Sequence, residues 1–168
     1  RLLPNADAFL SEVILMGALL MVVILLIHVL ENTFGLLTRA RLLELADQER
    51  PLLRKLSIEA PGTFEHTLML SSLAEEGARS IGADVDLTRT GALYHDVGKL
   101  HAPEWFIENQ KNDFNPHDQL GNPFKSAHIL QEHVDHGLLL AKKYGLPRRI
   151  ADFIPEHQGT MKMGYFLY

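Results

Sequence analysis

The chain has 168 residues, a formal net charge of −5 and no cysteine. This length accommodates one domain of ordinary size plus an appendage. The negative net charge argues against nonspecific binding of nucleic-acid polymers. The lack of cysteine excludes disulfides, thiolate metal sites and thiol nucleophiles. The chain begins at Arg1 and ends in an apolar run at Tyr168, so we expect it to be part of a longer protein.

Near its start the chain carries a segment that is apolar on all sides. Val13 to Ile27 run without a charged or strongly polar residue. Extended back to Ala8, the segment reaches about 20 residues, roughly enough for a helix to cross a hydrocarbon core. A buried core helix would need a larger protein around it, and a signal peptide would show a basic start and a small-residue cleavage site. We therefore predict a transmembrane helix, with membrane lipid as a partner.

Basic residues follow this segment rather than precede it. Only Arg1 lies before it, whereas the residues after it include Arg39, Arg41, Arg50, Arg54 and Lys55. Cytoplasmic flanks of membrane spans are enriched in Lys and Arg. The part of the chain after the span is therefore expected to be cytoplasmic.

Helical patterns dominate the remainder of the chain. Residues 36–60 read as helix, with Pro51 able to open a second short helix at its first turn. Thr63 is a plausible N-cap for the next helix, which a glycine stop ends at about Gly82. Leucines and alanines at helical spacing mark one apolar face along this stretch.

The second half continues in the same way. Asp86 or Thr88 is expected to cap a helix from Leu87 to about Val97, with Gly98 ending it. Residues 108–123 read as a long loop, which is usually functional or mobile. A long helix is predicted from about 124 to 144 and a shorter one over 147–154. No convincing strand and no repeat appear, so the fold class is predicted to be all-α.

Four histidines and one aspartate lie on successive predicted helices, on apolar faces or at helix ends. Imidazole and carboxylate suit iron, manganese or zinc, and an Asp directly after a His can bridge two ions. A lone inward histidine is more often a satisfied core residue than a ligand. Four of them with an aspartate, on helices around one core, favour a metal centre. The candidate ligands are His66, His95, Asp96, His133 and His157.

Other histidines compete for the site or lie outside it. His136 follows His133 by three residues, so either could point inward, and the apolar neighbours of His133 favour that residue. His101, His117 and His128 lie in or beside polar segments and are expected to face solvent. His117 could also touch a ligand from its loop.

Longer motifs resemble the bacterial seven-transmembrane HD proteins, within the HD superfamily of metal-dependent phosphohydrolases. The resemblance covers most of residues 36–168 and includes Tyr94-His-Asp-Val-Gly-Lys99, Phe106-Ile-Glu-Asn-Gln110, Asn115-Pro-His-Asp118 and Glu156-His-Gln-Gly-Thr160. It implies hydrolysis of cyclic di-AMP to the linear dinucleotide by water activated at two divalent metal ions, with iron or manganese expected. The cyclic dinucleotide is then the substrate.

The resemblance also implies roles for matching residues. His66, His95, Asp96, His133 and His157 resemble the metal ligands, with Asp96 bridging. Lys99 would neutralise or hydrogen-bond phosphate, which makes Asp96 and Lys99 the expected catalytic residues. The loop bordering the nucleotide would contribute Asn109, Gln110 and His117.

Two features depart from the family pattern. Many members carry a second histidine where this chain has Gln158, whose amide oxygen is a weaker ligand. The family's final metal-binding Asp would follow Tyr168, so the ligand set of this piece is expected to be incomplete.

The resemblance implies three parts: a transmembrane helix with flanks (1–35), juxtamembrane helices (36–62) and an HD domain (63–168) whose C-terminal part lies beyond the chain. It places the protein in the inner (cytoplasmic) membrane of a bacterium, with the HD domain in the cytoplasm. Two alternatives stay open. One is a catalytically weakened HD domain serving as a sensor or structural subunit of a membrane assembly, and the other is a phosphohydrolase of another nucleotide. A homo-oligomer or membrane-complex partners also remain open.

Overall fold

The structure, a computed structural model, describes residues 6–111 and 114–159. The chain divides into two units, Arg1–Thr38 and Arg39–Tyr168. Within the described ranges the backbone forms helices and their connections, without a strand. This confirms the predicted all-α fold class.

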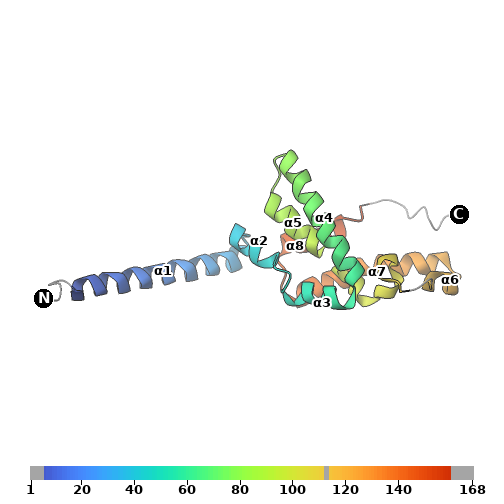
Figure 1. The fold of residues 1–168 in the computed structure, drawn as a ribbon, viewed down its shortest axis with the longest axis horizontal. Helices are drawn as coiled ribbons and strands as arrows, with labels where there is room; N and C mark the ends of the chain where they lie inside the picture. Colours follow the sequence, from blue (N-terminus) through green and yellow to red (C-terminus); the bar gives the residue numbers. More distant parts are fainter. Residues whose placement is uncertain (1–5, 112–113, 160–168) are drawn as a thin grey trace. The chain divides into compact units, whose positions relative to one another are not determined.

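The first unit is built around one long helix, α1 (Ala6–Phe34) (Figure 1, blue). Its stretch Ala6–Glu31 is long and apolar enough to cross a membrane, and its apolar side chains are exposed along its length. In water such a surface would be unfavourable. By length and composition, α1 therefore agrees with the predicted span, and the left-handed Gly35 ends it.

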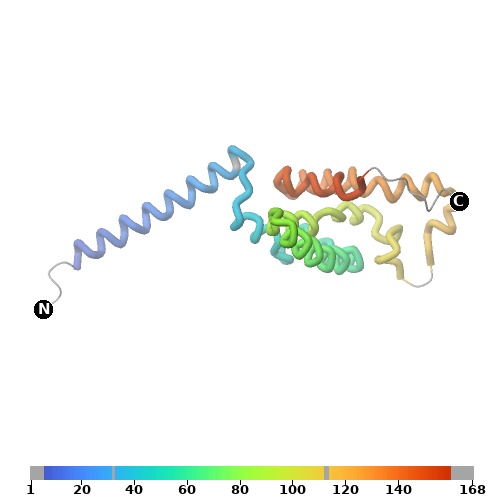
Figure 2. The backbone as a smooth tube through the Cα atoms, turned by 90° about the horizontal axis from the view of Figure 1, so that it is seen from above, coloured from blue at the N-terminus to red at the C-terminus, as the bar shows by residue number. Residues whose placement is uncertain are grey.

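The second unit is a bundle of helices and short 3₁₀ segments. Figure 2 shows α4 running beside α5, and close backbone contacts join these two helices as well as α7 and η1. The short helices α8 and α9 pack against α5. The elements in chain order are α2 (Arg39–Leu45), α3 (Pro51–Glu59), α4 (Pro61–Ser80), α5 (Val85–Tyr94), η1 (Val97–His101), η2 (Pro103–Trp105), η3 (Ile107–Asn109), α6 (Pro116–Leu120), α7 (Pro123–Lys143), α8 (Arg148–Ala151) and α9 (Phe153–Glu156).

The core of this unit surrounds the end of α5 and the start of η1. Tyr94 and Val97 are buried there, and the Tyr94 hydroxyl donates a 2.7 Å hydrogen bond to the Leu45 carbonyl oxygen. This bond joins α5 to α2 across the core. The other fully buried large side chains are Leu45, Leu52, Leu53, Leu56, Ile150 and Ile154.

Two glycines allow the backbones of η1 and α7 to touch. A Cβ atom added to Gly98 would lie 1.7 Å from the His133 carbonyl oxygen and 2.6 Å from the Gly137 nitrogen. A Cβ atom on Gly137 would lie 2.7 Å from a methyl carbon of Ile154. No side chain fits into these spaces, so the two glycines place His133 beside the turn that follows α5.

The observed helix α7 starts and ends within one residue of the predicted long helix, but the prediction for α5 is wrong at both ends. Asp84, rather than Asp86 or Thr88, caps this helix by accepting a 3.0 Å hydrogen bond from the Leu87 nitrogen. The helix ends at Tyr94, so His95 and Asp96 lie at and just beyond its C-terminus rather than in its last turns. Their side chains can therefore turn toward neighbouring helices.

Other boundaries also differ from the predictions. Pro61 opens α4, so Thr63 is a buried residue of its first turn and not its N-cap. The predicted loop 108–123 contains the end of η3 and helix α6, which the Asn115 side chain caps. Residues 36–60 form two helices separated by a turn, and 147–154 forms the neighbouring α8 and α9.

Replacing Tyr94 by Phe tests the contact between α2 and α5. We expect the free energy of unfolding to fall by about 1–2 kcal/mol at pH 7, because the Leu45 carbonyl loses its buried donor. Burial raises the pKa of Tyr94 to about 12, against a smaller opposing effect of Arg50, whereas an unfolded tyrosine titrates near pH 10. The stabilisation by the protonated phenol is therefore complete below pH 10 and is lost as the pH rises toward 12.

Urea unfolding at several pH values, followed by the fluorescence of Trp105, measures this difference. The gap in stability between wild type and Tyr94→Phe should narrow above pH 10. A gap that stays constant up to pH 11.5 would contradict the assignment.

Candidate metal centre

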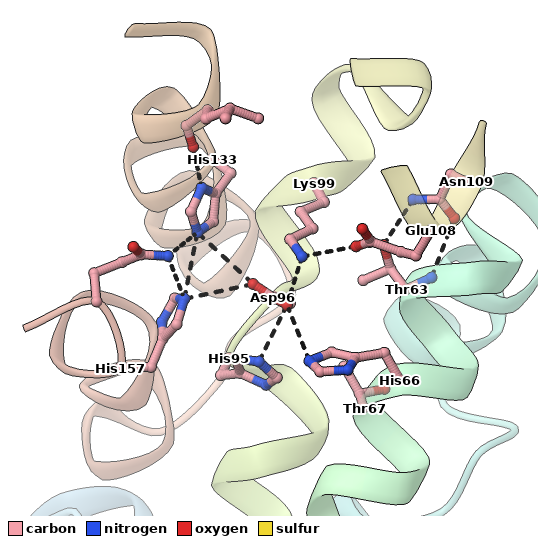
Figure 3. A network of polar contacts seen from close by, with 12 residues as sticks. Thr63, His66, Thr67, His95, Asp96, Lys99, Glu108, Asn109, His133 and His157 are labelled. Atoms are coloured by element: carbon pink, nitrogen blue, oxygen red, sulfur yellow. Dashed lines mark hydrogen bonds and ion pairs between the residues drawn. The ribbon is translucent and has the colours of Figure 1, made fainter. Parts of the chain in front are cut away.

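The buried carboxylate of Asp96 lies at the centre of a group of histidines (Figure 3). Its Oδ2 atom is 3.1 Å from His95 Nε2 and 3.9 Å from His66 Nε2. Its Oδ1 atom is 3.5 Å from His157 Nε2 and 3.7 Å from His133 Nε2. Two triads therefore share Asp96, and within each triad the potential ligand atoms lie within 4.8 Å of one another.

Different elements supply these side chains. His66 comes from α4, His95 from the C-terminal cap of α5, His133 from α7, and His157 from the residue after α9. The structure thus brings together all five residues that the sequence predicted as ligands. His66 is about half exposed, at 49% of its side chain, whereas His95, Asp96 and His133 are buried. The centre is consequently open to solvent on the α4 side.

The imidazole rings are oriented by the backbone. His95 and His157 each donate an Nδ1–H hydrogen bond of 2.7 Å to the carbonyl oxygen three residues earlier, and His133 contacts the carbonyl of Leu130 in the same way. Because a carbonyl only accepts, Nδ1 carries the proton in each ring. Nε2 then presents a lone pair toward Asp96, which is the arrangement of histidines that bind metals.

The contacts between Asp96 and the surrounding imidazoles are better explained by a bound cation than by hydrogen bonds. Asp96 Oδ1 is buried and accepts no hydrogen bond from the residues that the structure describes. The nearby Nε2 atoms of His133 and His157 point lone pairs at it. A buried acceptor facing further acceptors is unfavourable unless a positive charge lies between them. Imidazole and carboxylate are ligands of divalent iron, manganese and zinc, so the residues fit divalent metal binding.

Electrostatics keep the central carboxylate ionised. Burial alone would raise the pKa of Asp96, but its contacts with His157 and His95 and the charge of Lys99 outweigh this and hold the pKa well below its usual range. Burial lowers the pKa of His133, which favours its neutral, metal-binding form. For His157, burial is outweighed by Asp96, which raises the pKa of that imidazole.

Lys99 lies between two carboxylates. Its Nζ atom is 2.9 Å from Asp96 Oδ2 and 2.7 Å from Glu108 Oε1. Glu108 Oε1 also accepts a 3.0 Å hydrogen bond from Thr63 Oγ1. Asn109 completes the network, since its amide donates to Thr63 Oγ1 at 2.7 Å and accepts from the Thr63 nitrogen at 3.1 Å. The network joins η3 to the first turn of α4.

Sequence reasoning missed Glu108, although it lies inside the Phe106–Gln110 motif and carries that motif's only charge. The position of Asn109 beside the nucleotide stays a prediction, and in the structure its side chain is hydrogen-bonded to Thr63. The other two residues predicted for that role, Gln110 and His117, line a groove of about 800 Å³ with Trp105.

This groove approaches the metal centre through Phe106, which also lines it. The ring centroid of Phe106 lies 5.8 Å from that of His133, edge to face. His117, which also lines the groove, makes a 2.9 Å hydrogen bond from Nε2 to the Trp105 carbonyl oxygen. The imidazole of His117 is partly buried, whereas the sequence predicted that it faces solvent. An apolar, aromatic groove with a few amides is a typical small-molecule site.

The remaining histidines of this unit lie outside the two triads. His136 is turned away from Asp96 and stacks on His101, with ring centroids 4.3 Å apart. His133 is therefore the residue that points inward, as its neighbours indicated. The stacking leaves His101 half-buried, contrary to its predicted exposure, whereas His128 is exposed beside Glu132.

Gln158 lies across one triad. Its amide nitrogen is 2.8 Å from His157 Nε2 and 3.1 Å from His133 Nε2. The amide would therefore compete with a metal ion for the single Nε2 lone pair of each of these imidazoles. Turning the amide over would bring its oxygen to the same place as a weak neutral ligand.

Replacing Asp96 by Asn tests whether the two triads share one ligand. The amide is neutral and offers only one oxygen, so we expect Mn²⁺ affinity to fall by more than about 100-fold, beyond the usual effect of an outer-sphere change. Equilibrium dialysis with elemental analysis measures the metal content. Asp135→Asn, an exposed change on α7, is the matched control. Unchanged metal content in Asp96→Asn would contradict the shared-ligand geometry.

Replacing Gln158 by His tests how the amide limits the second triad. A second imidazole beside His157 is expected to tighten Mn²⁺ binding by about tenfold, because a metal ligand replaces a group that competes for the lone pairs. Calorimetric titration of wild type, Gln158→His and Gln158→Ala measures the effect. Equal affinities in all three proteins would show that Gln158 does not affect the centre.

Comparison with known proteins places this geometry in a family. The HD domain family matches residues 63–164, a range that includes both triads. An uncharacterised protein of Synechocystis sp. is 51% identical over 137 residues, which cover 82% of this chain and 17% of that protein. The cyclic-di-AMP phosphodiesterase PgpH of Bacillus subtilis is 39% identical over 167 residues, covering 99% of this chain and 22% of that protein.

The chain spans about a fifth of the length of these relatives. Among solved structures, it resembles the crystal structure of the Listeria monocytogenes PgpH HD domain with a TM-score of 0.68 and 41% identity, over 71% of this chain and 57% of that one. The same domain in complex with cyclic-di-AMP matches with the same TM-score and identity, over 56% of its chain. These matches confirm the resemblance first seen in the motifs, and the chain belongs to the HD domain family.

Proposed function

We propose that this chain is part of a membrane-anchored, metal-dependent phosphodiesterase that hydrolyses a cyclic dinucleotide, with cyclic di-AMP as the substrate. The observation that carries the proposal is the Asp96 carboxylate shared between two histidine triads. The named phosphodiesterase relatives and the related complex with cyclic-di-AMP support the substrate class. The reaction cleaves one phosphodiester bond with water.

The two triads would hold a pair of divalent ions, with iron or manganese favoured by the donor set. When bound, such a pair supplies Lewis acidity and an activated water for attack on phosphorus. Asp96 would bridge the pair, since each of its oxygens faces a different triad. The backbone carbonyls that orient His95, His133 and His157 keep the Nε2 atoms directed inward without rearrangement.

Lys99 would stabilise the substrate phosphate. Its ammonium lies 2.9 Å from Asp96 Oδ2, beside the place where a phosphate would meet the centre. The side chain is largely buried, at 14% exposure, so its charge is weakly screened. A fixed positive charge there favours the build-up of negative charge on the non-bridging phosphate oxygens during hydrolysis.

The groove beside Phe106 would take one nucleoside of the substrate. Its volume of about 800 Å³ is sufficient for such a ligand. Trp105 and His117 offer ring surfaces for a base, and the Gln110 amide offers a donor and an acceptor. Gln110 and His117, which were predicted to border the nucleotide, line this groove. Asn109, predicted for the same role, is hydrogen-bonded to Thr63.

Helix α1 would anchor the protein in the inner membrane of a bacterium. Its flank after the span carries Arg39 and Arg41, which favours a cytoplasmic location for the HD domain. A cyclic dinucleotide produced in the cytoplasm would then reach the centre from its exposed side at His66.

A second candidate function is favoured by Gln158. Its amide competes for the lone pairs of His133 and His157, so one triad would bind metal more weakly. In that case the HD domain would bind the cyclic dinucleotide without efficient hydrolysis and act as a sensor or structural subunit of a membrane assembly.

Turnover of cyclic di-AMP by the full-length protein in Mn²⁺ or Fe²⁺ tests the two candidates. The proposed enzyme should release the linear dinucleotide, detected by chromatography. Lys99→Met should lower kcat by about 100-fold or more, with a smaller change in KM, because the charge acts mainly on the transition state. Bound metal and bound nucleotide without turnover would refute the enzyme and favour the sensor.

A further inference from the structure

Glu108 makes contacts that the proposed chemistry does not use. Its carboxylate contacts Lys99 at 2.7 Å and accepts a hydrogen bond from Thr63 (Figure 3). Burial alone would raise the pKa of Glu108, but Lys99 outweighs this and lowers it. Glu108 is therefore a fixed negative charge beside the centre.

The position of Lys99 creates a conflict at the metal centre. Its ammonium lies 2.9 Å from Asp96 Oδ2, the oxygen that also faces His66 and His95. A divalent ion bound by that triad would be repelled by this charge and would compete with it for the same oxygen. A second attraction acting on the ammonium would therefore favour metal binding at Asp96.

Glu108 provides that second attraction from a rigid position. A Cβ atom added to Gly62 would lie 1.8 Å from the Glu108 carbonyl oxygen, so η3 and the start of α4 are in direct backbone contact. The hydrogen bonds of Thr63 to Glu108 and to Asn109 fix the side chains across this contact. Thr63 precedes His66 by one helical turn, which sets the Glu108 carboxylate relative to the ligand on α4.

We propose that Glu108 is a positioning residue that competes with Asp96 for the Lys99 ammonium and so leaves the Asp96 carboxylate available to metal. The inference rests on the proposed function for the presence of the metal ions. It assigns to Glu108 a role in metal affinity rather than in contact with substrate. The same carboxylate keeps Lys99 beside the phosphate position once the metal is bound.

Mn²⁺ binding by the full-length protein tests this role, measured by calorimetry without substrate. Glu108→Gln should weaken binding by about tenfold or more, the range seen for outer-sphere partners of metal ligands. Lys99→Met in the Glu108→Gln background should restore wild-type affinity, because the competing ammonium is then absent. Glu108→Asp keeps the charge and should stay within about threefold of wild type.

Glu104→Gln removes an exposed charge from the same segment and serves as the control. It should bind Mn²⁺ like wild type, which separates a local effect from general electrostatics. Wild-type affinity in Glu108→Gln would overturn the inference. So would a double variant as weak as Glu108→Gln, since Glu108 would then act only through the contact between η3 and α4. A wild-type protein that binds no Mn²⁺ would refute the proposed function itself.

Discussion

The second unit is organised around an ionised carboxylate in a buried position. Removing Asp96 from water is unfavourable unless opposite charge and suitable neighbours replace the lost hydration. Lys99 and His95 lie against one oxygen, and two more imidazoles face the other. Side chains from α4, the end of α5, α7 and the end of α9 meet around this group.

Backbone contacts without side chains make that meeting possible. Gly98 lets the turn after α5 touch α7, and Gly91 lets α5 accept the ring of Phe153 at the start of α9. The first contact brings His133 to Asp96, and the second holds α9 where His157 can reach it. A side chain added at either glycine would separate candidate ligands that lie on different helices.

The same carboxylate relates the metal centre to the charged network beside it. The charges of Asp96, Lys99 and Glu108 alternate in sign along this network. A hydrogen bond from Thr63 connects Glu108 to α4. Removing any one of these charges changes the electrostatic energy of the other two, because partly buried charges are weakly screened. Under the proposed function, metal affinity and phosphate recognition would be coupled through Lys99, which contacts Asp96 and would also meet the phosphate.

Local sequence signals account for much of this protein. An uninterrupted apolar run predicted the membrane-type helix α1, and apolar periodicity predicted the extent of α7, because both signals depend on residues close in sequence. Residue type and order predicted the HD family and the five candidate ligands, which the structure brings together: His66, His95, Asp96, His133 and His157. Helix boundaries were less predictable where two residues could serve as the N-cap. Asp84 and Asp86 are both suitable, and the structure uses Asp84.

Only the tertiary structure decided how the side chains meet. Each oxygen of Asp96 faces its own triad, and His133 rather than His136 points inward. Glu108 contacts both Lys99 and Thr63. The physical reason is that these contacts join residues distant in sequence, such as Thr63 and Glu108, and depend on how the helices pack.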